Sequence, residues 1–241
     1  MKEVRFFYAP DAESKTELPA EEVTHAVKVL RLQEGDDIFL IDGKGYFFKA
    51  QIDTVSNKHC FYHIVEKLVQ PKEWSGNIHL GIAPTKHIDR IEWMAEKATE
   101  IGFDQLSFLR CTNSERTVIR EDRIEKVVLS AVKQSRKPFV PQVNSLITFN
   151  EFITSPLPGR KFIAHCYEEI SKTDLFSELE NMSQDEDITI LIGPEGDFSI
   201  DEVHAAMANG FQSISLGRSR LRTETAGLYA VMMAHLKKQL I

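Results

Sequence analysis

From residue 78 onward, short apolar runs alternate with amphipathic helical segments. IHLGIA, QLSFL, KFIAHC, DITILIG and SISLG have the length and composition of buried strands. Between them, apolar residues return at helical spacing, as in HIDRIEWMAEKATEIG, EDRIEKVVLSAVKQS, SIDEVHAAMANG and TAGLYAVMMAHLKKQL. This alternation predicts an α/β domain with a mostly parallel sheet and with ligand sites at the carboxyl ends of its strands.

The first 70 residues follow a different pattern. EVRFFYA, DDIFLIDG, YFFKAQIDTV and CFYHIVEKL are rich in aromatic and β-branched residues and read as strands. One helix interrupts them, with Val23, Ala26, Val27 and Leu30 on one face. Because QPKEWSGN (residues 70–77) has the composition of a linker, we predict a small β-barrel over residues 1–70 and a second domain over 76–241.

Charge and cysteine usage exclude several classes of protein. The 29 basic and 36 acidic residues leave a net charge of −7, so there is no overall attraction to nucleic acid or to an anionic membrane. Residues 168–187 hold eight acids and one lysine and carry that whole surplus, which leaves room for basic patches elsewhere. The three cysteines have no CxxC spacing, which argues against a disulfide framework or a metal site. No long apolar run is present, so we expect a cytoplasmic protein.

The stretch ILIGPEGDFSIDE (residues 190–202) leads from an apolar strand through a turn into a helix. Ser199 and Glu202 have the spacing of a capping box at the helix start. Glycines in the GPEG turn let backbone amides approach a ligand closely, although a tight connection without any ligand has the same pattern. The absence of a following lysine and of GxGxxG spacing excludes a P-loop and a dinucleotide fingerprint.

A second stretch, SLGRSRLRTETAGLYA, repeats this geometry near the C-terminus. Thr223, Glu224 and Thr225 can cap the amides of the helix that they begin, which accounts for the threonines. It does not account for the three arginines at 218, 220 and 222, because positive charge repels a helix N-terminus. An anionic partner such as a phosphate accounts for them.

Together, IGPEGDFSIDE and LGRSRLRTETA resemble the C-terminal signature of the bacterial small-subunit (16S) ribosomal RNA uridine N3-methyltransferases, which belong to the SPOUT class. HAVKVLRLQEGD resembles that family's N-terminal RNA-binding domain, and KHIDRIEWMAEKATEIGFDQLSFLRCTNSE and SAVKQSRKPFVPQV resemble its central blocks. Five blocks in order make the resemblance specific. It implies a PUA-like β-barrel followed by a SPOUT domain whose chain forms a deep trefoil knot.

The resemblance also implies that the knotted domain forms a homodimer. The closing helix, with Ala226, Leu228, Val231 and Met232, is compatible with an interface and equally with a core.

On the same resemblance, the two bends hold S-adenosylmethionine, and no metal is needed. The implied cofactor-binding residues are His165, Cys166, Leu191, Ile192, Gly193, Pro194, Glu195, Gly196, Leu216, Gly217, Leu221, Arg222, Thr223 and Thr225. As an alternative, Cys166 is an ordinary buried cysteine. The chain departs from the family at Asp197, where a second glycine is usual, and at Arg220, where an aliphatic residue is usual. At Asp197 we expect an altered loop and a retained site. Arg220 argues against packing of its side chain on the cofactor.

Methylation at uridine N3 requires removal of the imide proton and stabilisation of the anion that results. Arg222 is the candidate for stabilising the anion, because its guanidinium is permanently charged. Glu224 is the candidate base, although it can equally cap the helix or pair with an arginine. Since N3 lies on the pairing edge, the target uridine must be unpaired or extruded.

Basic residues in three regions are candidates for contacts with rRNA in the small ribosomal subunit. In the small domain, His25, Lys28 and Arg31 recur every three residues on one helix face. The remaining candidates for RNA binding are Lys86, Arg90, Ser114, Arg116 and Arg136. Mixed-charge stretches are also common on solvated helix faces, which is the interpretation we favour for Arg123 and Lys126.

Three alternatives remain open. One is a SPOUT enzyme that modifies a ribose hydroxyl or another base. Another is an RNA-binding assembly factor without catalysis, which the departures at Asp197 and Arg220 keep open. A nucleotide-binding protein that uses GPEG for phosphate is the third, and it lacks a P-loop lysine or a carboxylate pair for a metal.

Overall fold

The computed structural model describes residues 5–239, which form two compact units. The first unit contains residues up to 72 together with 129–140, and the second contains 73–128 and the residues from 141 on. The predicted division at residues 70–76 placed residues 129–140 in the second domain, whereas in the structure they belong to the first unit. This segment pairs with the turn between two strands of the first unit, since Val140 N donates to Gly43 O (3.1 Å) and Gly45 N to Pro138 O (3.0 Å).

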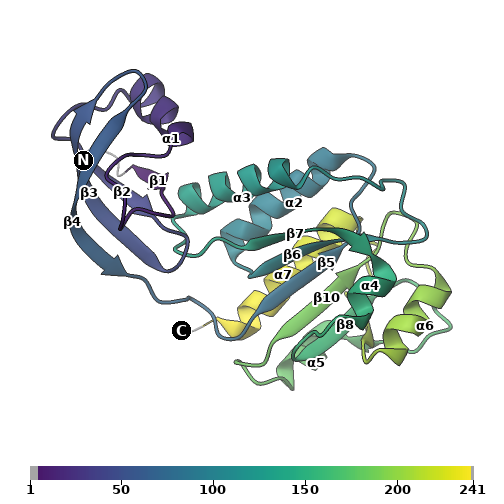
Figure 1. The fold of residues 1–241 in the computed structure, drawn as a ribbon. Helices are drawn as coiled ribbons and strands as arrows, with labels where there is room; N and C mark the ends of the chain where they lie inside the picture. Colours follow the sequence, from purple (N-terminus) through teal and green to yellow (C-terminus); the bar gives the residue numbers. More distant parts are fainter. Residues whose placement is uncertain (1–4, 240–241) are drawn as a thin grey trace. The chain divides into compact units, whose positions relative to one another are not determined.

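The first unit is built on a four-stranded sheet. Strand β1 (Phe6–Tyr8) runs parallel to β2 (Asp37–Ile41), and β2, β3 (Tyr46–Val55) and β4 (Cys60–Val69) follow in antiparallel order. Among the described residues that connect these strands, the only helical segment is α1 (Ala20–Thr24). It continues into a π-helical turn, η1 (His25–Val29). Figure 1 shows this segment beside the curved sheet. The predicted β-rich unit with one helix is confirmed.

The second unit contains a seven-stranded sheet in which every recorded pairing is parallel. The strand order is β7-β6-β5-β10-β8-β11-β9. All five residues of each central strand, β5 and β10, are buried, as expected for strands covered on both faces. The bounds are β5 (Ile78–Ile82), β6 (Gln105–Arg110), β7 (Gln142–Thr148), β8 (Arg160–Ala164), β9 (Thr173–Asp174), β10 (Ile188–Ile192) and β11 (Gln212–Ser215).

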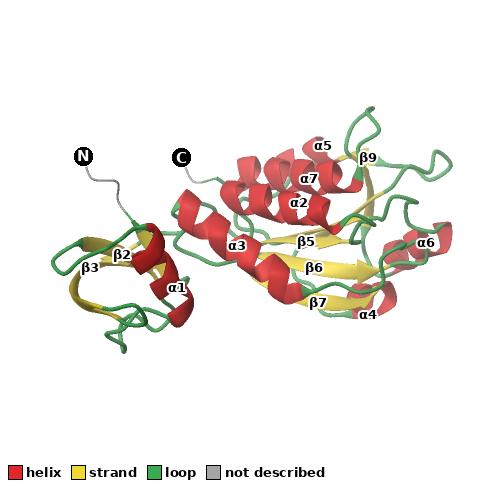
Figure 2. Ribbon diagram, turned by 90° about the horizontal axis from the view of Figure 1, so that it is seen from above, coloured by secondary structure: helices red, strands yellow, loops and turns green. Residues whose placement is uncertain are grey.

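Helices cover both faces of this sheet. In Figure 1, α7 runs behind the strands while α4 and α6 lie in front of them, and Figure 2 shows α2 beside α7. The helices that lie wholly in this unit are α2 (Ile88–Ile101), α4 (Phe149–Thr154), α5 (Leu175–Glu180), α6 (Ile200–Ala208) and α7 (Thr223–Lys238). Helix α3 (Glu121–Ser135) begins in this unit, and its residues from 129 on belong to the first unit. The predicted α/β fold with a parallel sheet is confirmed.

The sequence patterns did not indicate β7, α4, β9 or α5. Strand β7 lies at one edge of the sheet and none of its residues is fully buried, so its apolar signal is weak. Helices α4 and α5 have six residues each, which is too short for a helical period to stand out.

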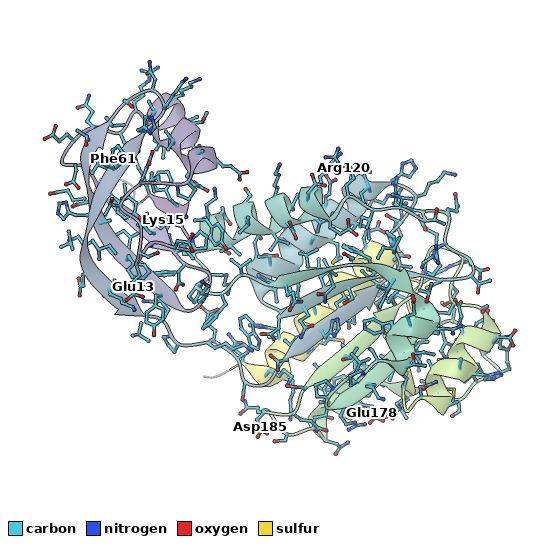
Figure 3. The ribbon with its side chains drawn as sticks, in the orientation of Figure 1. Glu13, Lys15, Phe61, Arg120, Glu178 and Asp185 are labelled. Atoms are coloured by element: carbon cyan, nitrogen blue, oxygen red, sulfur yellow. The ribbon has the colours of Figure 1, made fainter. Side chains whose placement is uncertain are left out.

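The acidic segment at residues 168–187 is partly used to hold the sheet together. Glu178 on α5, labelled in Figure 3, pairs with Arg160 at the start of β8, with 2.5 Å between Oε2 and Nη2. Asp187 accepts a hydrogen bond from Asn77 N at 2.8 Å, just before β5. Some of the surplus acids therefore fix strand ends.

The connection from β11 to α7 crosses other strands. β11 lies beyond β8 in the sheet, whereas α7 packs on β5 and β10. Residues 216–222 must therefore pass over the carboxyl ends of β8 and β10. The trefoil knot implied by the resemblance is not determined by these pairings and stays a prediction. None of the helices within residues 5–239 has the length and apolarity to cross a bilayer.

Candidate active site

The carboxyl ends of four adjacent strands meet at one edge of the sheet. The register aligns Ile192 with Ile82 and Ala164, and Ala164 with Ile214. The bend after β10 and the bend after β11 therefore leave the same edge, on either side of the end of β8. This arrangement brings the two predicted bends and His165 into one region.

The connection from β10 to α6 satisfies its own polar groups. Ser199 Oγ accepts a hydrogen bond from Glu202 N at 3.2 Å, and Glu202 Oε2 accepts one from Ser199 N at 2.8 Å. The predicted capping box is confirmed. The other oxygen of Glu202 accepts from Thr112 N at 2.8 Å, which attaches the helix start to the loop after β6.

Side chains also tie the GPEG turn to neighbouring loops. Glu195 Oε1 accepts from Lys86 N (2.9 Å), after β5. Asn113 Nδ2, after β6, donates to the carbonyl oxygens of Gly196 (3.3 Å) and Asp197 (3.1 Å). Asn113 was not among the residues predicted from the sequence, because nothing marks an isolated loop asparagine.

The first departure from the family has a structural explanation at Asp197. Its φ is 64°, a conformation in which glycine is favoured, and aspartate is one of the few other residues that tolerate it. Its carboxylate accepts hydrogen bonds from Cys166 N (2.7 Å) and Phe198 N (2.8 Å). Gly193 is required for a different reason, because a Cβ there would lie 2.9 Å from Phe198 N.

His165 and Cys166, at the end of β8, have contrasting environments. His165 is buried, its Nδ1 accepts from Tyr167 N (3.2 Å) and its Nε2 lies 2.5 Å from Ser213 Oγ. This pairing fixes the neutral tautomer with the proton on Nε2, and burial lowers the pKa of His165. Cys166 is exposed, so the alternative of an ordinary buried cysteine is wrong. Desolvation, followed by the Asp197 carboxylate, raises the pKa of the Cys166 thiol, which disfavours a nucleophilic thiolate.

The connection from β11 to α7 makes far fewer hydrogen bonds that would close its helix start. Arg222 is the N-cap of α7, and among residues 5–239 no side chain accepts a hydrogen bond at that cap, so the predicted capping by threonine is wrong. Gly217 has a φ of 105°, and its N donates to Ser215 Oγ at 3.1 Å. The arginines at 218, 220 and 222 are all exposed. The second departure from the family, Arg220, therefore projects to the surface.

Glu224, in the first turn of α7, is buried but not satisfied. Its relative exposure is 7%, and its Oε2 has no hydrogen-bond partner among residues 5–239. Its Oε1 lies 3.9 Å from Arg90 Nη1 on α2, which is an ion pair but too long for a hydrogen bond. Since buried polar groups are almost always hydrogen-bonded, a free carboxylate oxygen here suggests a place for a ligand.

The apolar residues predicted to contact the cofactor differ in exposure. Leu191 belongs to the hydrophobic core and its Cδ2 lies close to Gly81, and Ile192 and Pro194 are also buried. Leu216 and Leu221 are half-buried in the connection to α7. The roles of all these residues stay predictions.

The predicted RNA contacts of the second unit include groups that already have partners. Arg116 donates from Nε to Thr85 O (3.0 Å) and from Nη2 to Lys86 O (2.6 Å). Ser114 Oγ accepts from Cys111 N at 3.0 Å and closes a turn. Lys86 Nζ lies 2.8 Å from a carboxylate oxygen of Glu115, which raises the pKa of this lysine. These contacts shape the loops at the sheet edge.

Arg120, which precedes α3, is labelled in Figure 3 and projects outward; it pairs with Asp122 at 2.9 Å.

In the first unit, the prediction that three basic residues lie on one helix face is wrong. The helix ends at Val29, and Arg31 lies beyond it with a φ of 53°. His25, Lys28 and Arg31 are nevertheless all exposed. Arg136, the fourth candidate in this unit, places its guanidinium 5.2 Å from the centre of the Phe6 ring.

Comparison with known proteins gives consistent matches. Residues 72–235 match a family profile described as an RNA methyltransferase domain, and residues 18–64 match one described as an RNA methyltransferase PUA domain. A crystal structure of a probable rRNA-methyltransferase from Porphyromonas gingivalis has a TM-score of 0.90 and 41% identity, covering 98% of each chain.

Two further relatives carry a more specific description. Ribosomal RNA small subunit methyltransferase E from Neisseria gonorrhoeae, crystallised with S-adenosyl methionine, has a TM-score of 0.80 and 28% identity over 95% of each chain. The protein of the same name from Bacillus subtilis is 26% identical over 234 residues, covering 93% of this chain and 91% of its own.

Proposed function

This chain belongs to the RNA methyltransferase family, and on that premise we propose that it transfers a methyl group from S-adenosylmethionine to N3 of one uridine in 16S ribosomal RNA. The names of the relatives and the bound S-adenosyl methionine in the Neisseria structure support the substrate and the cofactor. The order and spacing of the sequence blocks support N3 of uridine as the position.

The residues at the sheet edge fit the cofactor. Its amino-acid part carries a carboxylate, and the N-terminus of α7 offers backbone amides that are not capped by a side chain within the described part of the chain. Gly217, in the connection that leads to this helix, has open space around it, since a Cβ there would meet no atom within 4 Å. When bound, S-adenosylmethionine supplies an electrophilic methyl group on its sulfonium.

The incomplete hydrogen bonding of the buried Glu224 side chain is the observation that carries the proposal. A buried carboxylate with one oxygen that has no hydrogen-bond partner in the described part of the chain can accept the proton of an imide nitrogen. Arg222 immediately precedes the same helix and can stabilise the negative charge that spreads onto the uracil oxygens. The protein thus provides orientation, a proton acceptor and a fixed positive charge.

We include a homodimer in the proposal. Ala226 and Val231 are buried within the chain, so they belong to its core. An exposed apolar group remains on α2 and α7, formed by Trp93, Tyr229, Met232 and Leu236. Such a group suits an interface between copies. Sedimentation of the purified protein, compared with a Leu236→Glu variant, tests it. A cytoplasmic location follows if the substrate is ribosomal RNA.

Methylation by the purified protein tests the function. Small-subunit RNA, free and in assembled subunits, is incubated with S-adenosylmethionine, and the product nucleoside is mapped. We expect N3-methyluridine at a single position. A methylated ribose or another base would favour a different SPOUT activity, and absence of cofactor binding in calorimetry would favour a non-catalytic RNA-binding factor.

A further inference from the structure

We infer that Arg90 and Glu224 together read the pairing edge of the target base and select uracil over cytosine. This inference rests on the proposed function and adds a specificity role, since Arg90 was otherwise a candidate for phosphate contact only.

The two side chains come from the first turns of two packed helices. Arg90 is the third residue of α2 and Glu224 is the second residue of α7. The helices contact each other, and α7 also packs on β5. A Cβ on Gly227 would lie 2.9 Å from Ile82 Cδ1, so the beginning of α7 lies close to the end of β5. The pair is therefore held on rigid elements at the sheet edge where the loops meet.

The hydrogen bonding of this pair is incomplete, in contrast to its neighbour. Arg123 Nη2 donates to Glu92 Oε2 at 2.9 Å, a normal charge-assisted hydrogen bond. Glu92 Oε1 makes no hydrogen bond within residues 5–239, but it forms an ion pair with Arg123 Nε, so this guanidinium reaches both carboxylate oxygens. The 3.9 Å separation of Arg90 and Glu224 leaves both groups open, and Glu224 Oε2 has no partner among residues 5–239. The side chain of Glu224 is 9% exposed, compared with 16% for that of Glu92.

An unsatisfied buried carboxylate is costly to maintain. Arg90 and the positive end of α7 offset its charge, but neither supplies a hydrogen bond to Oε2. A ligand that donates one hydrogen bond to the carboxylate and accepts one from the guanidinium would complete both groups.

The pairing edge of uracil has this pattern. Its N3–H is a donor, and the carbonyl oxygens on either side are acceptors. Glu224 Oε2 can accept from N3–H while Arg90 donates to the carbonyl oxygen O4. In cytosine, N3 is an acceptor and the 4-amino group is a donor, so an acceptor would face the carboxylate and a donor would face the guanidinium. A matched pair of base contacts is worth about 1–3 kcal/mol of discrimination, or roughly 5- to 150-fold.

The same contact prepares the chemical step. The N3–H bond breaks as its proton passes to the Glu224 carboxylate, and the N3 electron pair forms the new bond to the methyl carbon. The bond between that carbon and sulfur breaks, and its electrons leave with S-adenosylhomocysteine. Cytosine has no N3 proton to give, so recognition and reaction exclude the same base.

Binding of two RNA fragments tests the inference. One fragment carries the mapped uridine and the other carries cytidine at that position. We expect wild-type protein to bind the uridine fragment at least about fivefold more tightly. Arg90→Gln and Glu224→Gln should reduce this preference to below threefold, with the dissociation constant of S-adenosylmethionine changed by less than twofold. Arg123→Gln removes the neighbouring Arg–Glu pair and should keep the full preference.

The outcomes separate the inference from the proposed function. If wild-type protein methylates uridine but binds both fragments equally, or if Arg90→Gln and Glu224→Gln keep the wild-type preference, the specificity role is refuted and the function stands. If wild-type protein neither binds S-adenosylmethionine nor methylates RNA, both are refuted. Should Arg90→Gln fail to fold, Arg90→Lys replaces it, and an unchanged preference in that variant counts against the inference, because lysine lacks the planar donor pair.

Discussion

The two strand-to-helix connections that leave the same sheet edge are built in opposite ways. Between β10 and α6, a capping box closes the helix start, and carboxylates of Glu195, Asp197 and Glu202 accept hydrogen bonds from backbone amides. Between β11 and α7, no side chain caps the helix, and Glu224 keeps one buried oxygen without a partner among the described residues.

The difference separates structural from functional sequence signals. A connection whose polar groups are satisfied internally needs no ligand to be stable, although it can shape a site. A connection with an uncapped helix and an unsatisfied buried acid is stable at a cost, which a bound substrate and cofactor can offset. Ligand chemistry is therefore expected mainly at the connection from β11 to α7, whereas the connection from β10 to α6 mainly stabilises the structure.

The largest effect is expected at the unsatisfied acid. Glu224→Gln keeps the size of the side chain but removes its capacity to take a proton, so kcat should fall about 10²- to 10⁴-fold. Single-turnover methylation measures it, and calorimetry with S-adenosylmethionine should show little change. A variant with wild-type kcat would contradict the assignment of Glu224 as base.

A satisfied group elsewhere in the sheet should affect stability and not binding. His79 on β5 is buried, with Nε2 2.8 Å from Ser107 Oγ, and burial lowers the pKa of His79 to about 4. Because the unfolded state takes up the proton first, near pH 6.5, stability should fall as the pH drops from about 6.5 to 4, by about 3 kcal/mol from this residue. Urea unfolding of wild type and His79→Gln measures it. An equal pH dependence in both proteins would contradict the prediction.

The caps of the two helices allow a direct test of the comparison. Ser199→Ala removes the α6 cap and should lower the free energy of unfolding by about 1 kcal/mol. Thr225→Ala alters an exposed residue in the first turn of α7 that makes no cap, and should change it by less than about 0.5 kcal/mol. Thermal unfolding of both variants measures the difference. Equal losses would show that the two helix starts do not differ.

The smallest effect is expected at Asp197. In Asp197→Gly, loss of the hydrogen bonds to Cys166 N and Phe198 N is offset by relief of the positive φ. Stability should change by about 1 kcal/mol or less, and the affinity for S-adenosylmethionine by less than about threefold. Calorimetry measures the affinity, and a loss of more than tenfold would show that Asp197 has a direct role in the site.

Local patterns predicted much of the fold because they depend on neighbouring residues. The strand at Ile188–Ile192 is an uninterrupted apolar run, and Ser199 and Glu202 have the spacing that closes a capping box. The same reasoning was wrong for the threonines at the start of α7, because the helix begins at Thr223 and leaves Arg222, which has no acceptor in its side chain, at the N-cap. It was also wrong for Arg31, where a π-helical turn ends the helix early.

The sequence by itself determined the alternation of strands and helices, the family and the two bends, since these lie in contiguous segments. Only the tertiary structure decided that Glu224 lies beside Arg90, 134 positions earlier in the chain, and that Asp197 reaches the end of β8. Such pairings depend on strand order and on the crossing of residues 216–222 over the sheet edge, and no local pattern encodes which distant side chains meet there.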